Sequence, residues 1–139
     1  MPENILVAVD GSEPSLKGLA IAEQVARAAG AKLLLTYVIP PFGEGTELEG
    51  MLPPGVYERA QKQAEQIVSN AASRTKGLEV EQVVLNGRPA ETLADLAEKR
   101  NAWLVVIGSR GRGAVARALL GSVADRLVRI CHQPVLVVH

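Results

Sequence analysis

Five short apolar runs alternate along this chain with longer segments of helical periodicity. The runs are Ile5–Val9, Lys32–Val38, Glu79–Leu85, Trp103–Ile107 and Val135–Val138. Runs of this length, rich in β-branched residues, are typical of strands buried on both faces. The segments between them are long enough for crossover helices, so the alternation predicts βαβ units. We therefore expect an α/β fold in which one open, five-stranded parallel sheet carries helices on both faces.

Glycine, proline and capping residues mark the ends of the expected helices. Gly30 follows the first apolar helical face as a left-handed cap, and Gly77 ends the second helix. Pro89 opens the third helix, because its fixed φ suits a first helical position. The fourth helix covers about Ser122–Cys131, and Ser122 and Asp125 have the spacing of a capping box.

Composition narrows the class of protein. The chain has 139 residues, which is the size of one domain, here residues 1–139. Fifteen basic residues balance fifteen acidic ones, and aromatic residues make up 3% of the chain. This balance, with so few rings for stacking bases, argues against nucleic acid as a partner. No apolar run approaches the roughly 20 residues that span a bilayer, so we expect no membrane association. Cys131 has no second cysteine to form a disulfide with, so we expect a cytoplasmic location.

The segment Pro40–Gly55 breaks the pattern, with four prolines and four glycines in sixteen residues and no periodicity. It is longer than an ordinary connection and leaves the carboxyl end of a predicted strand. The segment is therefore either a tolerated insertion or a functional loop. Its acidic residues Glu44, Glu47 and Glu49 are either solubilising charges or groups within reach of a Mg²⁺ ion.

A glycine-rich stretch beginning at Gly108 follows the fourth predicted strand. Glycines at such a turn let backbone amides converge on an anion, and Arg110 and Arg112 add two guanidinium groups that grip phosphate oxygens. Gly121 and Ser122 open the last helix, whose positive end also favours phosphate. A purely structural role stays open for both residue types, because such glycines also serve tight packing and arginines are commonly exposed to solvent.

Better-known phosphate loops do not fit this stretch. A dinucleotide fingerprint follows the first strand, whereas these glycines follow the fourth at positions 108, 111 and 113. A Walker loop needs a Lys-Ser or Lys-Thr pair, which this stretch lacks.

The spacing Gly108-x2-Gly111-x9-Gly121-Ser122 resembles the nucleotide-binding signature of the universal stress protein family. The segments Ile5–Ser12, Tyr37–Ile39, Gly121–Asp125 and Pro134–Val138 are similar to this family as well, so the resemblance covers essentially the whole chain. It implies a Rossmann-like sheet of strand order 3-2-1-4-5, related to adenine-nucleotide α-hydrolases. It also implies binding of ATP, with Mg²⁺, and a dimer.

Strand order 3-2-1-4-5 places a ligand crevice between strands one and four, where neighbouring connections leave to opposite sides. Asp10 ends the first strand at this crevice, and it is either a ligand contact or the residue that forms an Asx-turn or N-cap for the first helix. By similarity, the adenosine half of ATP contacts Ala8, Val9, Asp10 and Val38. The ribose and phosphates would contact Gly108, Ser109, Arg110, Gly111, Arg112, Gly121, Ser122 and Val123.

Three functions follow from these observations. The favoured one is an ATP-binding regulatory module of the stress response, with at most slow hydrolysis, because no residue pattern identifies a metal clamp or a group that positions water. The alternatives are an adenine-nucleotide hydrolase or ligase of related fold, and a dimeric interaction protein that needs no nucleotide. We expect a homodimer through Val135–Val138, an edge strand that no charge interrupts. A further protein partner is not identified by the sequence.

Overall fold

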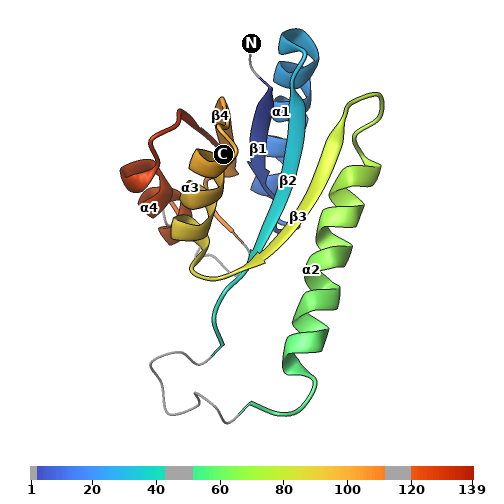
Figure 1. The fold of residues 1–139 in the computed structure, drawn as a ribbon, viewed down its shortest axis with the longest axis vertical. Coiled ribbons are helices and arrows are strands. Elements are labelled where there is room, and N and C mark those ends of the chain that lie inside the picture. The colour runs from blue at the N-terminus through green and yellow to red at the C-terminus, as the bar shows by residue number, and fades with distance from the viewer. Residues whose placement is uncertain (1–2, 43–51, 112–119) are drawn as a thin grey trace.

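The computed structural model describes residues 3–42, 52–111 and 120–139. Its elements are β1 (Asn4–Ala8), α1 (Glu13–Ala29), β2 (Lys32–Ile39), α2 (Val56–Ser73), β3 (Val80–Asn86), α3 (Pro89–Lys99), β4 (Leu104–Gly108), α4 (Ser122–Ile130) and β5 (Val135–Val138). The five strands form one parallel sheet of order β3-β2-β1-β4-β5 (Figure 1). The predicted α/β class, strand number and strand order are confirmed.

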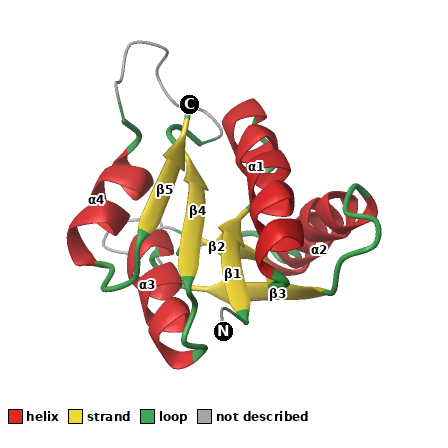
Figure 2. Cartoon of the chain, turned by 90° about the horizontal axis from the view of Figure 1, so that it is seen from above, coloured by secondary structure: helices red, strands yellow, loops and turns green. Residues whose placement is uncertain are grey.

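Two helices cover each face of the sheet (Figure 2). Helices α1 and α2 pack on the face that presents Ile5, Val7 and Leu35, whereas α3 and α4 pack on the face that presents Leu6 and Val105. Because side chains alternate along a strand, consecutive apolar residues in β1 fill both layers. This explains why the buried strands read as continuous apolar runs.

Strand ends differ from the predicted ones by about one residue. β1 ends at Ala8, β2 continues to Ile39 and β3 is shifted to Val80–Asn86. The predicted fourth strand began at Trp103, but β4 begins at Leu104 and extends to Gly108. The Trp103 side chain is 45% exposed, since this residue precedes the part of β4 that the helices cover.

The ends of two helices correct the sequence prediction. Helix α2 stops at Ser73, because the Arg74 amide already bonds the Ala71 carbonyl and the Thr75 hydroxyl donates to the Ala72 carbonyl. Gly77, with φ +79°, therefore lies in the following turn rather than at the helix cap. By contrast, Gly30 is the left-handed cap of α1, as predicted.

The capping box predicted from Ser122 and Asp125 is wrong. Gly121 is the N-cap of α4, which places Ser122 inside the helix as its first residue. The Asp125 amide bonds the Gly121 carbonyl at 2.9 Å, and the Asp125 carboxylate lies 3.3 Å from the Arg129 guanidinium, one turn ahead. The helix therefore begins without a side-chain cap from its N-cap residue, and its first amides lie beside the carboxyl end of β4.

A charged cluster holds the edge strand β3 at the amino end of the sheet. The Arg100 guanidinium donates to both carboxylate oxygens of Glu81, at 2.7 and 2.9 Å, and the Lys32 ammonium lies 3.2 Å from the same carboxylate. The hydrogen bond from Arg100, opposed by burial and assisted by Lys32, lowers the pKa of Glu81 to about 2. The cluster ties α3 and β2 to the edge strand, at the end of the sheet opposite Gly108.

In the described part of the chain, no helix is both long enough and apolar enough to cross a membrane.

Candidate functional site

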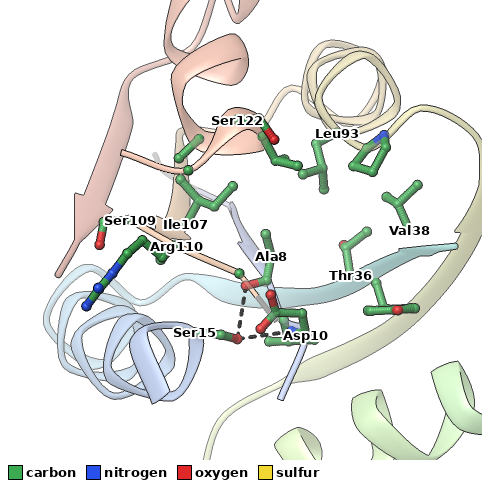
Figure 3. Close-up of a pocket in the computed structure, with 18 of the residues that line it drawn as sticks. Ala8, Asp10, Ser15, Thr36, Val38, Leu93, Ile107, Ser109, Arg110 and Ser122 are labelled. Atoms are coloured by element: carbon green, nitrogen blue, oxygen red, sulfur yellow. Dashed lines mark hydrogen bonds between the residues drawn. The ribbon is translucent and has the colours of Figure 1, made fainter. Parts of the chain in front are cut away.

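A cavity of about 510 Å³ lies at the carboxyl ends of β1, β2 and β4 (Figure 3). It opens between β1 and β4, the neighbouring strands whose connections leave to opposite faces of the sheet. Ligands of open parallel sheets bind at this kind of position. The sheet therefore places a ligand-sized space where strand order alone predicts one.

Polar and apolar residues are mixed around the cavity. In Figure 3, Ile107 lies beside Ser109 and Arg110 on one side, and Thr36 lies beside Val38 on the other. Asp10 and Ala8 form the floor between them. A ligand that fills the whole cavity must therefore combine an apolar part with an anionic or strongly polar part.

Asp10 is held by a hydrogen bond to one carboxylate oxygen and lies close to Gly111 with the other. The Ser12 amide donates to Oδ1 at 2.8 Å, which is the Asx-turn expected at the start of α1. A Cβ atom added to Gly111 would lie 2.8 Å from Oδ2, so the carboxylate lies directly against the glycine turn. Asp10 thus forms the Asx-turn and also lines the cavity, whereas the N-cap of α1 is Ser12; contact of Asp10 with a ligand stays a prediction.

Gly108 owes its identity to packing against α1. A Cβ atom at this position would lie 2.8 Å from both the Pro14 carbonyl carbon and the Ser15 backbone nitrogen. Real Cβ atoms do not approach backbone atoms so closely, so any other residue would push β4 and α1 apart. Tight packing therefore accounts for the glycine at position 108, and the same residue also lines the cavity.

The glycine turn, α4 and β5 are joined by backbone hydrogen bonds. The Ser109 amide donates to the Val138 carbonyl at 2.7 Å, and the Ser109 carbonyl accepts from the Gly121 amide at 2.6 Å. A Cβ atom at Gly121 would lie 3.2 Å from that same carbonyl oxygen, a tight approach that a small shift of the neighbouring backbone would relieve. These bonds aim the amino end of α4 at the cavity, where Ser122, Val123 and Ala124 form part of the wall.

The amino end of α4 is a suitable place for phosphate. The first intrahelical bond of α4 comes from the Asp125 amide, so the amides before it precede the hydrogen-bonding ladder. Such amides and the positive end of the helix dipole attract anions. Ser109, which lies away from Ser122 in Figure 3, is 1% exposed, and its hydroxyl has no hydrogen-bond partner within the described residues.

The structure gathers nearly all of the predicted site residues around this cavity. Its lining includes Ala8, Val9, Asp10, Val38, Gly108, Ser109, Arg110, Gly111, Gly121, Ser122 and Val123. Arg112 lies outside the described residues, as do Glu44, Glu47 and Glu49. The contacts of all these residues with a ligand stay predictions.

Several lining residues were not identified from the sequence. They are Ser15, Thr36, Tyr37, Pro40, Pro89, Leu93, Ile107, Leu120 and Ala124. Thr36 could have been found, since it lies two residues before Val38 and shares its face of β2. Pro89 and Leu93 carry no such signal, because they reach the cavity only through the packing of α3 on the sheet.

Comparison with known proteins gives a consistent result. The model of the universal stress protein family matches residues 1–139. A universal stress protein of Thermus aquaticus is 34% identical over 142 residues, which is 99% of this chain and 99% of that protein.

Solved structures show the same fold. The structure of a universal stress protein from Archaeoglobus fulgidus superposes with a TM-score of 0.79 at 26% identity and covers all of both chains. The crystal structure of a universal stress protein in complex with cAMP has a TM-score of 0.75 at 30% identity, over 99% of this chain and 97% of that one. The family model covers the whole chain, and the solved structures share its fold, so the chain belongs to the universal stress protein family.

Proposed function

We propose that this protein binds ATP with Mg²⁺ and acts as a nucleotide-dependent regulatory module. The observation that carries the proposal is the cavity itself, which is lined by apolar residues such as Val38 and Leu93 and by the amino end of α4. An adenine ring suits the apolar residues and a phosphate chain suits the amino end of the helix. The similar universal stress protein in complex with cAMP supports an adenine nucleotide as the ligand class.

Mg²⁺ is proposed to arrive with the nucleotide rather than in a cage of protein ligands. Protein-bound Mg²⁺ commonly keeps several waters and is held by one or two carboxylates together with substrate phosphates. Asp10 is the only carboxylate among the described residues that line the cavity. No group of three or more His, Cys, Asp or Glu side chains able to hold a metal ion occurs within residues 3–42, 52–111 and 120–139.

Hydrolysis of ATP is proposed to be slow. Fast phosphoryl transfer requires a side chain that positions the attacking water as well as a metal clamp. Asp10, the carboxylate that lines the cavity, already accepts a hydrogen bond from the Ser12 amide and lies against Gly111. A hydrolase or ligase of related fold is therefore the less favoured function.

We also propose a homodimer through β5. This strand pairs with β4 on one side, and no described strand pairs with its other side. Its residues Val135, Leu136 and Val137 are half-buried in the single chain, and an uncharged apolar edge of this kind invites another strand. Antiparallel pairing with a second copy about a two-fold axis would satisfy both edges.

Calorimetric titration with ATP and GTP tests the binding proposal. We expect heat from ATP with Mg²⁺ and much weaker binding of GTP. Equal heats of binding for ATP and GTP would contradict a preference for adenine, and the absence of heat with either nucleotide would refute nucleotide binding.

Ser122→Asp tests the placement of the phosphates. An aspartate in the first turn of α4 suits the helix dipole, so the variant should fold, but its charge opposes phosphate there. We expect ATP affinity to fall by about tenfold or more, the effect of at least 1.4 kcal/mol of repulsion. Ser69→Asp, on an exposed part of α2 away from the cavity, changes net charge equally and serves as the control. Equal affinities in the two variants would place the phosphates elsewhere.

A further inference from the structure

We propose that Ser15 is a positioning residue of the nucleotide site, whose buried hydroxyl holds Asp10 in its orientation toward the glycine turn after β4. The proposal rests on the proposed nucleotide binding for its effect on affinity. The geometry of Ser15 itself stands independently of any ligand.

The Ser15 hydroxyl bonds two backbone groups at the carboxyl end of β1. Its Oγ accepts from the Asp10 amide at 3.1 Å and donates to the Ala8 carbonyl at 3.5 Å (Figure 3). A hydroxyl has one proton to donate and lone pairs to accept, so the two bonds are compatible. Ser15 is 3% exposed, which leaves little access for water to replace either bond.

The same short segment also sets the position of β4. Gly108 packs so closely on Pro14 and Ser15 that a Cβ atom there would lie 2.8 Å from the Ser15 backbone nitrogen. The turn after β1 is therefore held by the Ser15 side chain, and the end of β4 packs on the Ser15 backbone. Both walls of the crevice thus depend on the first turn of α1.

Asp10 is the residue whose orientation depends on this arrangement. Its amide donates to Ser15, its Oδ1 accepts from the Ser12 amide, and its Oδ2 lies against Gly111. Without the Ser15 hydroxyl, the Asp10 amide and the Ala8 carbonyl both lose a partner in a partly buried place. Such groups turn toward water or other partners, which rotates the peptide next to the Asp10 carboxylate.

Ser12 provides a matched control on the same turn. Its hydroxyl accepts from the Ser15 amide at 3.3 Å and caps α1, whereas the Asp10 amide donates to the Ser15 hydroxyl. Ser12 is not among the described residues that line the cavity. Ser12→Ala and Ser15→Ala each remove a hydroxyl from the start of α1. Only Ser15→Ala removes the acceptor of the Asp10 amide.

The experiment measures two properties of Ser15→Ala, Ser12→Ala and the wild type. Hydrogen exchange of the Asp10 amide, followed by NMR without nucleotide, should be about tenfold faster in Ser15→Ala than in Ser12→Ala, as expected for loss of a direct hydrogen bond. ATP affinity, measured by calorimetry, should fall by about tenfold in Ser15→Ala and by less than about twofold in Ser12→Ala. Ser15→Thr keeps the hydroxyl and should restore most of the affinity.

The outcomes separate positioning from general loosening. Equal losses of ATP affinity in the two alanine variants at equal melting temperature would overturn the proposal, since loosening of α1 would then explain both. Unchanged exchange of the Asp10 amide in Ser15→Ala would overturn it as well. If the wild type binds no ATP, the proposed function fails, and the exchange measurement alone still decides whether Ser15 holds the Asp10 turn.

Discussion

The contact between Gly108 and α1 yields the sharpest stability prediction. In Gly108→Ala, the new Cβ atom would lie 2.8 Å from the Pro14 carbonyl carbon and 2.8 Å from the Ser15 nitrogen. Both neighbours are backbone atoms, so no side-chain rotation relieves the overlap, and β4 or the start of α1 must move by about half an ångström. Overpacking of this kind costs about 1–3 kcal/mol. For a chain of 139 residues we expect the melting temperature to fall by roughly 4–10 °C.

Gly18→Ala is the matched control, because it adds a Cβ atom to the same helix-to-strand interface. There the nearest atom is Val106 Cγ1 at 3.4 Å, an ordinary contact, and Gly18 has no positive φ. Alanine favours the helix over glycine by up to about 1 kcal/mol. Gly18→Ala should therefore raise the melting temperature by about 2–4 °C.

Thermal unfolding of both variants without nucleotide, followed by circular dichroism at one protein concentration, checks that Gly108→Ala lowers the melting temperature and Gly18→Ala raises it. If Gly108→Ala melts at the wild-type temperature, the close approach of β4 to α1 does not constrain this position, and Gly108 would have to be explained by ligand contact alone. If both variants lose equal stability, the interface tolerates no added methyl group and the contrast between the two sites is wrong.

Three further outcomes are expected. The Pro134 and Val138 carbonyls bond β4, so the Val137 amide, one residue out of phase, faces the free edge of β5. Val137→Pro removes that donor and should convert the proposed dimer to monomer or aggregate, whereas a wild type that light scattering finds monomeric at micromolar concentration contradicts the dimer. Because the pKa of Glu81 is lowered from 4.5 to about 2, its ion pair stabilises the fold above about pH 4.5 and is lost as the pH falls toward 2. Glu81→Gln should therefore cost about 1 kcal/mol at pH 7, a value discounted for a side chain that is 40% exposed. The cost should be much smaller at pH 2, where about half of the folded molecules carry a protonated Glu81, as measured by urea unfolding; a cost independent of pH would refute the assignment. Steady-state release of phosphate from ATP should stay well below about 10 per second, and turnover at that rate that is lost in Asp10→Ala would identify an enzyme.

Local pattern was enough to predict most secondary structure. Apolar runs marked the strands to within about one residue, and Gly30 and Pro89 marked helix ends by their own backbone preferences. The alternation of strands and helices predicted a parallel sheet covered on both faces. The strand order came from resemblance to a family, because periodicity reports which face of an element is buried and not which element lies beside it.

The candidate site was predicted in part for the same reason. Asp10, Gly108 and Gly121 follow strands or open a helix, so their positions relative to the crevice follow from the order of the sheet. The failed capping box shows the limit of spacing, since Ser122 and Asp125 have the expected separation but the chain enters α4 at Gly121.

Tertiary packing decided what each site residue does. The sequence identified Gly108 as a turn residue. The reason that this position requires glycine is its close approach to Pro14 and Ser15, more than ninety residues earlier in the chain. These residues come near Gly108 only when α1 packs on β4. Leu93 and Thr36 line the cavity because α3 and β2 meet there, and Ser15 reaches Asp10 because α1 turns back over the end of β1. Sequence determines local conformation through the preferences of neighbouring residues, whereas distances between remote segments are set by how side chains of several elements fill a shared core.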